Sequence, residues 1–124
     1  MKTIESVRLE KKLSAPKSVT TKVELNYTKD STTDCTIPIG TKLNVHFSET
    51  NLNRVYFDYN GSLRALSIVN AHKYITGFSK SPSLSTLERW SNDGYCKTPT
   101  GDKTEPDGYG MDGCPSWLLV VGMI

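Results

Sequence analysis

The sequence has no hydrophobic run of the length that a membrane-spanning helix requires, which is about 20 residues. Its longest apolar stretch is the final WLLVVGMI. The opening stretch, MKTIESVRLEKKL, is charged throughout and has no apolar segment like that of a signal peptide. We therefore expect a cytoplasmic protein with no membrane partner.

Cysteine and histidine are scarce and widely spaced. Structural zinc usually takes closely spaced ligand pairs such as C-x2-C, and no such pair occurs here. Three cysteines cannot all pair within one chain, and without an export signal we expect reduced thiols. We expect no metal and no cofactor. The residues concerned are Cys35, Cys96, Cys114, His46 and His72.

Known catalytic signatures are also missing. The sequence contains no P-loop, nucleophile elbow, HExxH motif or dinucleotide glycine fingerprint. The scattered thiols and histidines could still meet in space, which leaves Cys-His catalysis open. The pattern favours a non-enzymatic binding protein, and we identify no catalytic residue.

Charge of one sign does not dominate. The 124 residues carry a formal net charge of +2, too small to indicate nucleic-acid binding by itself. Its distribution is uneven, with +3 over residues 1–30, +2 over residues 31–90 and −3 over residues 91–124. Such asymmetry could orient the molecule against a polyanion, and an ordinary solvated surface is the alternative.

The first half of the chain alternates apolar and polar residues, as half-buried strands do. The segments are VTTKVELNY, CTIPIGTKLNVHF, VYFDY and SLRALSI. Asn60 and Gly61 lie between the last two, and Asn-Gly predicts a hairpin because a type I′ turn needs positive φ at both residues. We predict a mainly β (α+β) fold, a small SH3-like or OB-like curled sheet or barrel with one or two short helices.

One domain with a single core suits a chain of this length. We expect a flexible start over residues 1–15, a β meander over 19–68, a helical insert over 69–94, and a hairpin, turns and a buried strand over 95–124. The clearest helix runs from Ser83, a good N-cap, to Gly94, which can end it in the left-handed conformation. Between these caps Leu84, Leu87 and Trp90 recur at three-residue spacing and predict a buried face.

The C-terminal region combines turn residues with an apolar end. YCKTPTGDKTE predicts a hairpin around Thr100 and Gly101, and PDGYGMDG predicts two successive Asp-Gly turns. PSWLLVVGMI has almost no polar side, which predicts a central strand that is covered on both faces.

The segment SLSTLERWSNDGYCKTPTG resembles the second helix and wing of the winged helix-turn-helix proteins of the excisionase and MerR type. In that family polar helix residues contact bases and basic wing residues neutralise phosphate. The resemblance assigns base contacts to Ser83, Ser85, Thr86 and Arg89, and backbone contacts to Lys97 and Lys103. The preceding TGFSKSP is longer than the turn of the family, and one amphipathic helix covering the end of a barrel is the alternative.

A second candidate site is the acidic, glycine-rich segment GDKTEPDGYGMDG. Its carboxylates suit calcium, but their order does not fit an EF-hand loop, and turn chemistry explains the composition without metal. The segment also suits a patch that docks onto a basic partner protein or imitates phosphate. That patch would comprise Glu105, Asp107, Tyr109 and Asp112.

A third candidate is a set of tyrosines near basic residues. Aromatic rings interleaved with Arg or Lys stack single-stranded bases. Arg54 and Tyr56 share one side of their strand, opposite Phe57, so we expect that face to be a platform for nucleic acid. Tyrosine also suits protein interfaces, and half-buried structural tyrosine is the alternative.

The end of the chain, together with PSLSTLERWSNDG, resembles the C-terminal part of short uncharacterised proteins of bacteriophages and other mobile elements. The resemblance covers about the last forty residues and implies a bacterial host cell as the setting. Small proteins of such genomes are often DNA-binding regulators or inhibitors of host and defence machinery. The leading hypothesis is therefore nucleic-acid binding through the helix and hairpin. The alternative is inhibition of a host or anti-phage defence complex through the acidic loop and exposed tyrosines.

Overall fold

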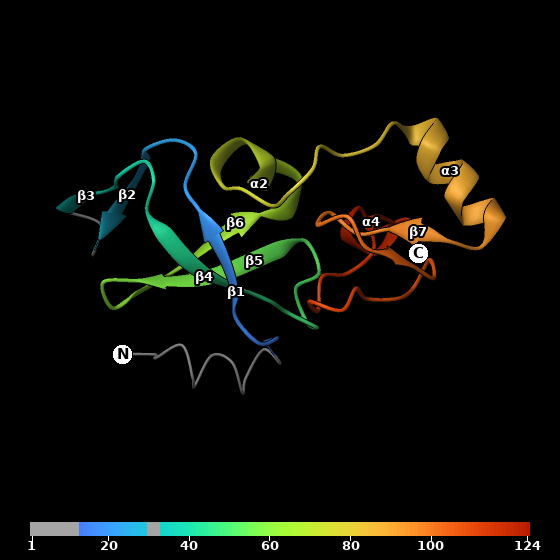
Figure 1. The fold of residues 1–124 in the computed structure, drawn as a ribbon, viewed down its shortest axis with the longest axis horizontal. Coiled ribbons are helices and arrows are strands. Elements are labelled where there is room, and N and C mark those ends of the chain that lie inside the picture. Colours follow the sequence, from blue (N-terminus) through green and yellow to red (C-terminus); the bar gives the residue numbers. More distant parts are fainter. Residues whose placement is uncertain (1–12, 30–32) are drawn as a thin grey trace.

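The computed structural model describes residues 13–29 and 33–124 (Figure 1). The strands are β1 (Lys17–Thr20), β2 (Leu25–Lys29), β3 (Thr33–Ile37), β4 (Lys42–Phe47), β5 (Arg54–Tyr59), β6 (Ser62–Ser67), β7 (Cys96–Lys97) and β8 (Lys103–Thr104). The described helices are α2 (Ile68–Tyr74), α3 (Leu84–Asp93) and α4 (Trp117–Val120). All strand pairs are antiparallel. The prediction of a mainly β fold with short helices is confirmed.

The main sheet has the strand order β1-β4-β5-β6. Because β1 and β6 lie at its two edges, the sheet formed by the described strands is open and is not a closed barrel. The alternation in the sequence correctly identifies its core face, where Val45, Phe47, Val55 and Phe57 are all buried. The pairs β2-β3 and β7-β8 form separate two-stranded sheets.

The turn between β5 and β6 is the Asn-Gly turn predicted from the sequence. Asn60 and Gly61 have φ values of 50° and 80°, and the residues on either side of them face each other across the two strands. The carboxylate of Asp58 accepts a hydrogen bond from the N–H of Gly61 at 3.1 Å. Local turn chemistry therefore sets the register of this hairpin.

The segment predicted as one strand over residues 19–27 is divided between two sheets. Its first part lies in β1 and its second part in β2. Between them the N–H of Lys22 donates to the carbonyl of Tyr74 at 2.7 Å, which draws the chain away from the main sheet. Val23, expected on the buried face, is 40% exposed. Alternation could not predict this break, because the bonding partner is distant in sequence.

Helix α2, in the predicted helical insert, ends at Tyr74 and does not extend to Gly77, a glycine that could have ended it in the left-handed conformation. Ile75 follows it in an extended conformation and is completely buried. Next to it, the N–H of Thr76 donates to the carbonyl of Thr20 in β1 at 2.9 Å. Burial of Ile75 and pairing with β1 therefore end the helix before the glycine is reached.

Helix α3 has both predicted caps. The hydroxyl of Ser83 accepts a hydrogen bond from the N–H of Thr86, and Gly94 is left-handed with φ of 76°. Leu87 and Trp90 are buried, but Leu84 is 63% exposed. Three-residue spacing drifts around a helix of 3.6 residues per turn, so the first of three such residues turns away from the face that the last one occupies.

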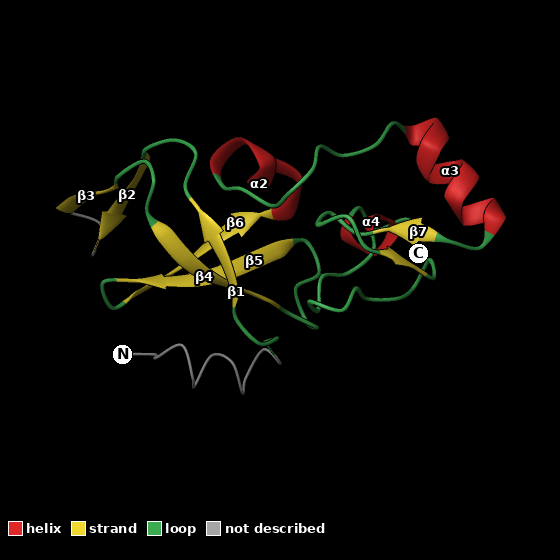
Figure 2. Ribbon diagram, in the orientation of Figure 1, coloured by secondary structure: helices red, strands yellow, loops and turns green. Residues whose placement is uncertain are grey.

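The two halves of the molecule share a hydrophobic core. In Figure 2 the main sheet and α2 occupy one half, and α3, α4 and the β7-β8 hairpin occupy the other. One cluster of buried side chains includes Phe47 and Phe57 from the sheet, Leu87 and Trp90 from α3, and Trp117 from α4.

The apolar end of the chain is a short helix, α4, and not the predicted strand. The hydroxyl of Ser116 accepts from the N–H of Leu119 at 3.2 Å and caps it. The predicted burial is correct for Trp117 and Leu118, which are at most 1% exposed, whereas Ile124 is 54% exposed. Short apolar runs do not separate strand from buried helix by periodicity, and the N-capping serine is the signal that was missed.

Candidate nucleic-acid interface

Helix α3 and the β7-β8 hairpin form one structural unit, which we call the helix-hairpin unit (residues 83–104). Helix α3 packs on β7 and on α4. The rings of Trp90 and Tyr95 lie 6.4 Å apart and join the end of the helix to the start of the hairpin. Nζ of Lys103 lies 4.8 Å from the centre of the Tyr95 ring, a cation–π contact that places this charge beside the helix.

Two of the predicted phosphate-binding residues face each other. Lys97 and Lys103 are direct partners in the β7-β8 register, and both are exposed. Like charges directly opposite each other destabilise an antiparallel pair. Neither lysine has an ion pair with an acidic side chain in the described part of the chain. A bound anion between them would relieve this repulsion.

The predicted base-contacting residues, at the start of α3 and along it, differ in their exposure and in their hydrogen bonds. Arg89 and Ser85 are exposed, and Thr86 is half-buried. The hydroxyl of Ser83 lies 3.2 Å from that of Ser85 and 3.0 Å from that of Thr86, in addition to its cap bond. These three hydroxyls therefore form a network that begins the helix, whereas Arg89, like the neighbouring Glu88, is exposed in its second half.

The helix before α3 does not form a helix-turn-helix arrangement with it. Residues 75–83 separate α2 from α3, and Figure 1 shows this segment as a long connection between the two helices. Helix α2 packs on β6, whereas α3 packs on β7 and α4. The unit that the structure contains is thus a helix with a wing-like hairpin.

The platform expected around Arg54 and Tyr56 is not formed as predicted. Arg54 is exposed at the start of β5, outside the helix-hairpin unit. Tyr56 is only 7% exposed, packs against Leu13, and its hydroxyl accepts a hydrogen bond from the side-chain amide of Asn51 at 2.6 Å. A buried ring with an engaged hydroxyl does not present a stacking face, and the structural alternative describes this tyrosine.

The residues of the acidic patch have two different roles. Glu105, Asp107 and Tyr109 are exposed, as a docking patch requires. Asp112 instead faces inward, where Oδ2 accepts from the hydroxyl of Thr100 at 2.7 Å and Oδ1 accepts from the N–H of Cys114 at 3.0 Å. Asp112 is therefore a structural residue of the turn, which corrects its assignment to the outward patch.

The charges around Asp112 explain its acidity. Burial by itself raises the pKa of Asp112, but the hydrogen bonds from Thr100 and Cys114 and the nearby charge of Lys17 outweigh burial and lower it below its usual value. The carboxylate is therefore ionised at neutral pH. Lys17 and the two hydrogen-bond donors compensate this negative charge, so it adds little to the electrostatic potential at the protein surface.

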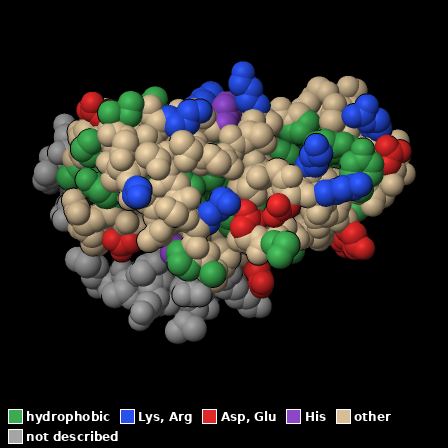
Figure 3. Space-filling view, viewed as in Figure 1, with side chains coloured by type: hydrophobic (Ala, Val, Ile, Leu, Met, Phe, Trp, Pro, Cys, Tyr) green, Lys and Arg blue, Asp and Glu red, His purple; other side chains and the backbone are tan. Residues whose placement is uncertain are grey.

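The surface charge around the unit is mixed. On the face shown in Figure 3, Lys and Arg side chains lie over the end of the molecule formed by α3 and β7, with Asp and Glu side chains beside them. The lysine pair and Arg89 are thus local cationic features and not part of a uniformly basic face.

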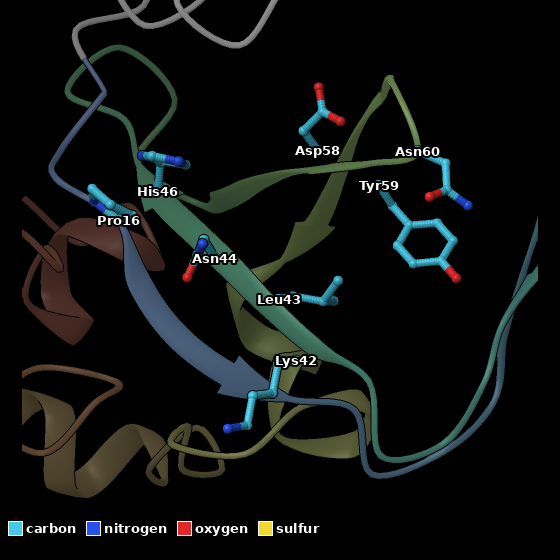
Figure 4. A pocket seen from close by; sticks show the side chains of 8 residues that line it. All are labelled: Pro16, Lys42, Leu43, Asn44, His46, Asp58, Tyr59 and Asn60. Atoms are coloured by element: carbon cyan, nitrogen blue, oxygen red, sulfur yellow. The ribbon is translucent and has the colours of Figure 1, made fainter.

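A separate cavity of about 350 Å³ lies on the outer side of β4 (Figure 4). His46 and Asp58 both line it but serve local structure, because Nδ1 of His46 lies 2.9 Å from the carbonyl of Ser14 and Asp58 accepts from the turn at Gly61. The other lining residues are Pro16, Lys42, Leu43, Asn44, Tyr59 and Asn60. Over residues 13–29 and 33–124, no three Asp, Glu, His or Cys side chains gather in a metal-binding group.

No family model, curated protein or solved structure matches the chain. Among the described residues, no helix is both long enough and apolar enough to cross a lipid bilayer.

Proposed function

We propose that this chain is a small non-enzymatic protein of the phage or mobile-element type that binds nucleic acid through the helix-hairpin unit. The observation that carries the proposal is the pairing of two exposed lysines, Lys97 and Lys103, across the β7-β8 hairpin. Arg89 on the adjoining helix supplies a further positive charge near the same end of the molecule. This combination suits phosphate groups, which bind lysine as a point charge and arginine through two hydrogen bonds.

The proposal predicts an affinity that depends strongly on salt. Each phosphate neutralised on duplex DNA releases counterions and contributes about −0.9 to the slope of log K against log salt concentration. Two lysines and one arginine therefore predict a slope of roughly −3 from this unit. The contact of Lys103 with the Tyr95 ring holds one of these charges in place before binding.

Fluorescence anisotropy with labelled duplex and single-stranded oligonucleotides at low salt tests the proposal. We expect binding by the wild type, and weaker binding with a shallower salt slope for the double variant Lys97→Gln/Lys103→Gln. Lys42→Gln replaces an exposed lysine on β4 and removes one charge, so it is the matched control for the single variants Lys97→Gln and Lys103→Gln. Absence of binding at tens of micromolar, or equal loss in the control, would refute the proposal.

A second candidate function is inhibition of a host or defence protein complex, favoured by the shape of the acidic segment. From Gly101 to Met111 every second residue is exposed, and these exposed residues include Glu105, Asp107, Tyr109 and Met111. Met111 is completely exposed, and Tyr109 is 43% exposed. Two carboxylates beside two large apolar groups suit a basic protein surface with an apolar pocket.

Affinity capture from nuclease-treated bacterial lysate tests this second function. We expect a partner to be retained by the wild type and lost by Glu105→Lys/Asp107→Lys and by Met111→Ser. Asp112 is left unchanged because it holds the turn together. A partner that binds both variants with the same affinity as the wild type would show that these exposed residues do not form the docking surface.

A further inference from the structure

A second cationic region adjoins the helix-hairpin unit. The sequence has no acidic residue between Asp58 and Glu88, a stretch that includes α2, the connection to α3 and the start of α3. The same stretch contains Lys73 and Lys80, both exposed. Every charged side chain in this stretch is therefore basic, without the interspersed carboxylates that surround Lys97 and Lys103.

The end of α2 gathers two lysines from different parts of the chain. Lys73 lies in the last turn of the helix. Lys22, from the turn after β1, donates from Nζ to the carbonyl of His72 at 2.9 Å, and its N–H donates to the carbonyl of Tyr74. Figure 3 shows Lys and Arg side chains gathered beside a histidine along the edge of the molecule where Figure 1 places α2.

Hydrogen bonds fix the connection between α2 and α3 to the hairpin. Both the N–H and the hydroxyl of Ser79 donate to the carbonyl of Pro99, at 2.8 and 3.0 Å. Lys80 is the next residue after Ser79, and Lys97 lies two residues before Pro99. With 3.8 Å between consecutive Cα atoms, the backbones of Lys80 and Lys97 lie on the order of 15 Å apart or closer.

We propose that nucleic acid bound at the helix-hairpin unit continues over the connection and reaches the end of α2, with Lys80 and Lys73 as additional phosphate contacts. This inference rests on the proposed function. The nine residues 75–83 span at most about 30 Å when fully extended, so the end of α2 lies within roughly nine base pairs of the start of α3. The added path is thus at most about one turn of duplex DNA.

Lys22 has a structural role of its own in this surface. A positive charge at a helix C-terminus stabilises the helix, and Lys22 supplies it through one of its three N–H donors. Substitution of Lys22 would therefore change both stability and charge. Lys73 and Lys80 make no ion pair or side-chain hydrogen bond among the described residues, so they are the cleaner pair to replace.

The test compares two DNA stem-loops of one sequence family, with stems of about 6 and about 16 base pairs, since only the longer stem exceeds the span between the two regions. We expect Lys73→Gln/Lys80→Gln to weaken binding of the long stem roughly tenfold and to reduce its salt slope by about two. Binding of the short stem, which is about 20 Å long and can still reach Lys80 but offers fewer phosphates toward the end of α2, should weaken less than that of the long stem. Lys73→Arg/Lys80→Arg keeps the charge and should bind the long stem like the wild type.

The outcomes separate this inference from the proposed function. Lys97→Gln/Lys103→Gln should weaken both stems. If that variant weakens binding but Lys73→Gln/Lys80→Gln does not, the extended path is wrong and the helix-hairpin interface stands. If the wild type binds neither stem, both proposals fail.

Lys42→Gln is the control for lost charge. An equal loss of affinity for the long stem with Lys42→Gln would indicate an effect of net charge and not a defined path, which would also overturn the inference. Urea unfolding of every variant confirms that fold is retained.

Discussion

Lys17 in β1 lies with its Nζ 3.3 Å from Oδ2 of Asp112, so that an ion pair joins the main sheet to the C-terminal turns. The aspartate also accepts hydrogen bonds from Thr100 and Cys114, which bind the hairpin turn to the last Asp-Gly turn. One carboxylate therefore connects β1 to two turns of the C-terminal region. The Lys17 and Asp112 side chains are 32% and 18% exposed, so the donors to the carboxylate contribute more than the ion pair itself.

Replacing Asp112 with Asn should destabilise the fold by about 2 kcal/mol, because an amide nitrogen would face donors in place of an accepting oxygen. The pKa of Asp112 is lowered in the folded state, so its contribution is present above the unfolded pKa, about 4, and is lost as pH falls through the folded value. We expect the difference in unfolding free energy between wild type and Asp112→Asn to be constant from pH 5 to 8. It should shrink below about pH 4, as measured by urea denaturation.

Lys17→Gln is the comparison for this prediction. It removes the ion pair but leaves the hydrogen bonds from Thr100 and Cys114, so we expect a loss below about 1 kcal/mol. A loss as large as that of Asp112→Asn would show that the ion pair, and not the hydrogen bonds, stabilises this junction.

Local turn and cap chemistry was predictable from the sequence. Asn60 and Gly61 have the positive φ values that their hairpin needs, and Ser83 and Gly94 cap α3 as expected. Each of these features depends on residues within four positions of one another. The helix-hairpin unit is built from elements that are consecutive in the chain, and so its helix and its hairpin could be predicted from the sequence.

Features that depend on distant partners were not predictable. The chain turns away from the main sheet at Lys22 because the N–H of Lys22 donates to the carbonyl of Tyr74. Tyr56 is buried, although alternation along the strand predicted an exposed ring. Asp112 was assigned to an outward patch, although its environment is set by Lys17, which is 95 positions earlier in the chain. Which charges are compensated internally is decided by tertiary contacts, and this limits any assignment of a charged site from sequence.

The thiols should differ sharply in reactivity. Burial raises the pKa of Cys114 to about 12, with the charge of Asp112 adding to the effect, so almost no thiolate exists at pH 8. Cys96 is also completely buried, whereas Cys35 is only partly buried. We expect iodoacetamide at pH 8 to label Cys35 first and the other two only in denaturant, as followed by peptide mass spectrometry. Rapid labelling of Cys114 in the native protein would contradict its placement in the core.

The apolar end of the chain should be essential up to α4 and dispensable beyond it. Trp117→Ala removes a side chain that is 1% exposed and should cost about 3 to 5 kcal/mol. Deletion of Met123 and Ile124, which are 39% and 54% exposed, should cost far less. Chemical denaturation of both variants gives the comparison. Hydrogen exchange should show protection at Val121, whose N–H donates to Trp117, and an unprotected amide there would contradict the helix.

Substitutions of Ser83 test whether its hydroxyl caps α3 or contacts a base. Its hydroxyl caps the helix, so Ser83→Ala should lower stability by about 1 kcal/mol. Ser83→Asp should retain stability, because aspartate is an equally good cap and suits the positive end of the helix dipole. Under the proposed function, the added negative charge should weaken DNA binding, whereas Ser83→Ala should bind like the wild type below its unfolding temperature. If Ser83→Ala instead loses affinity while folded, the hydroxyl contacts a base directly, and the capping network must open when nucleic acid binds.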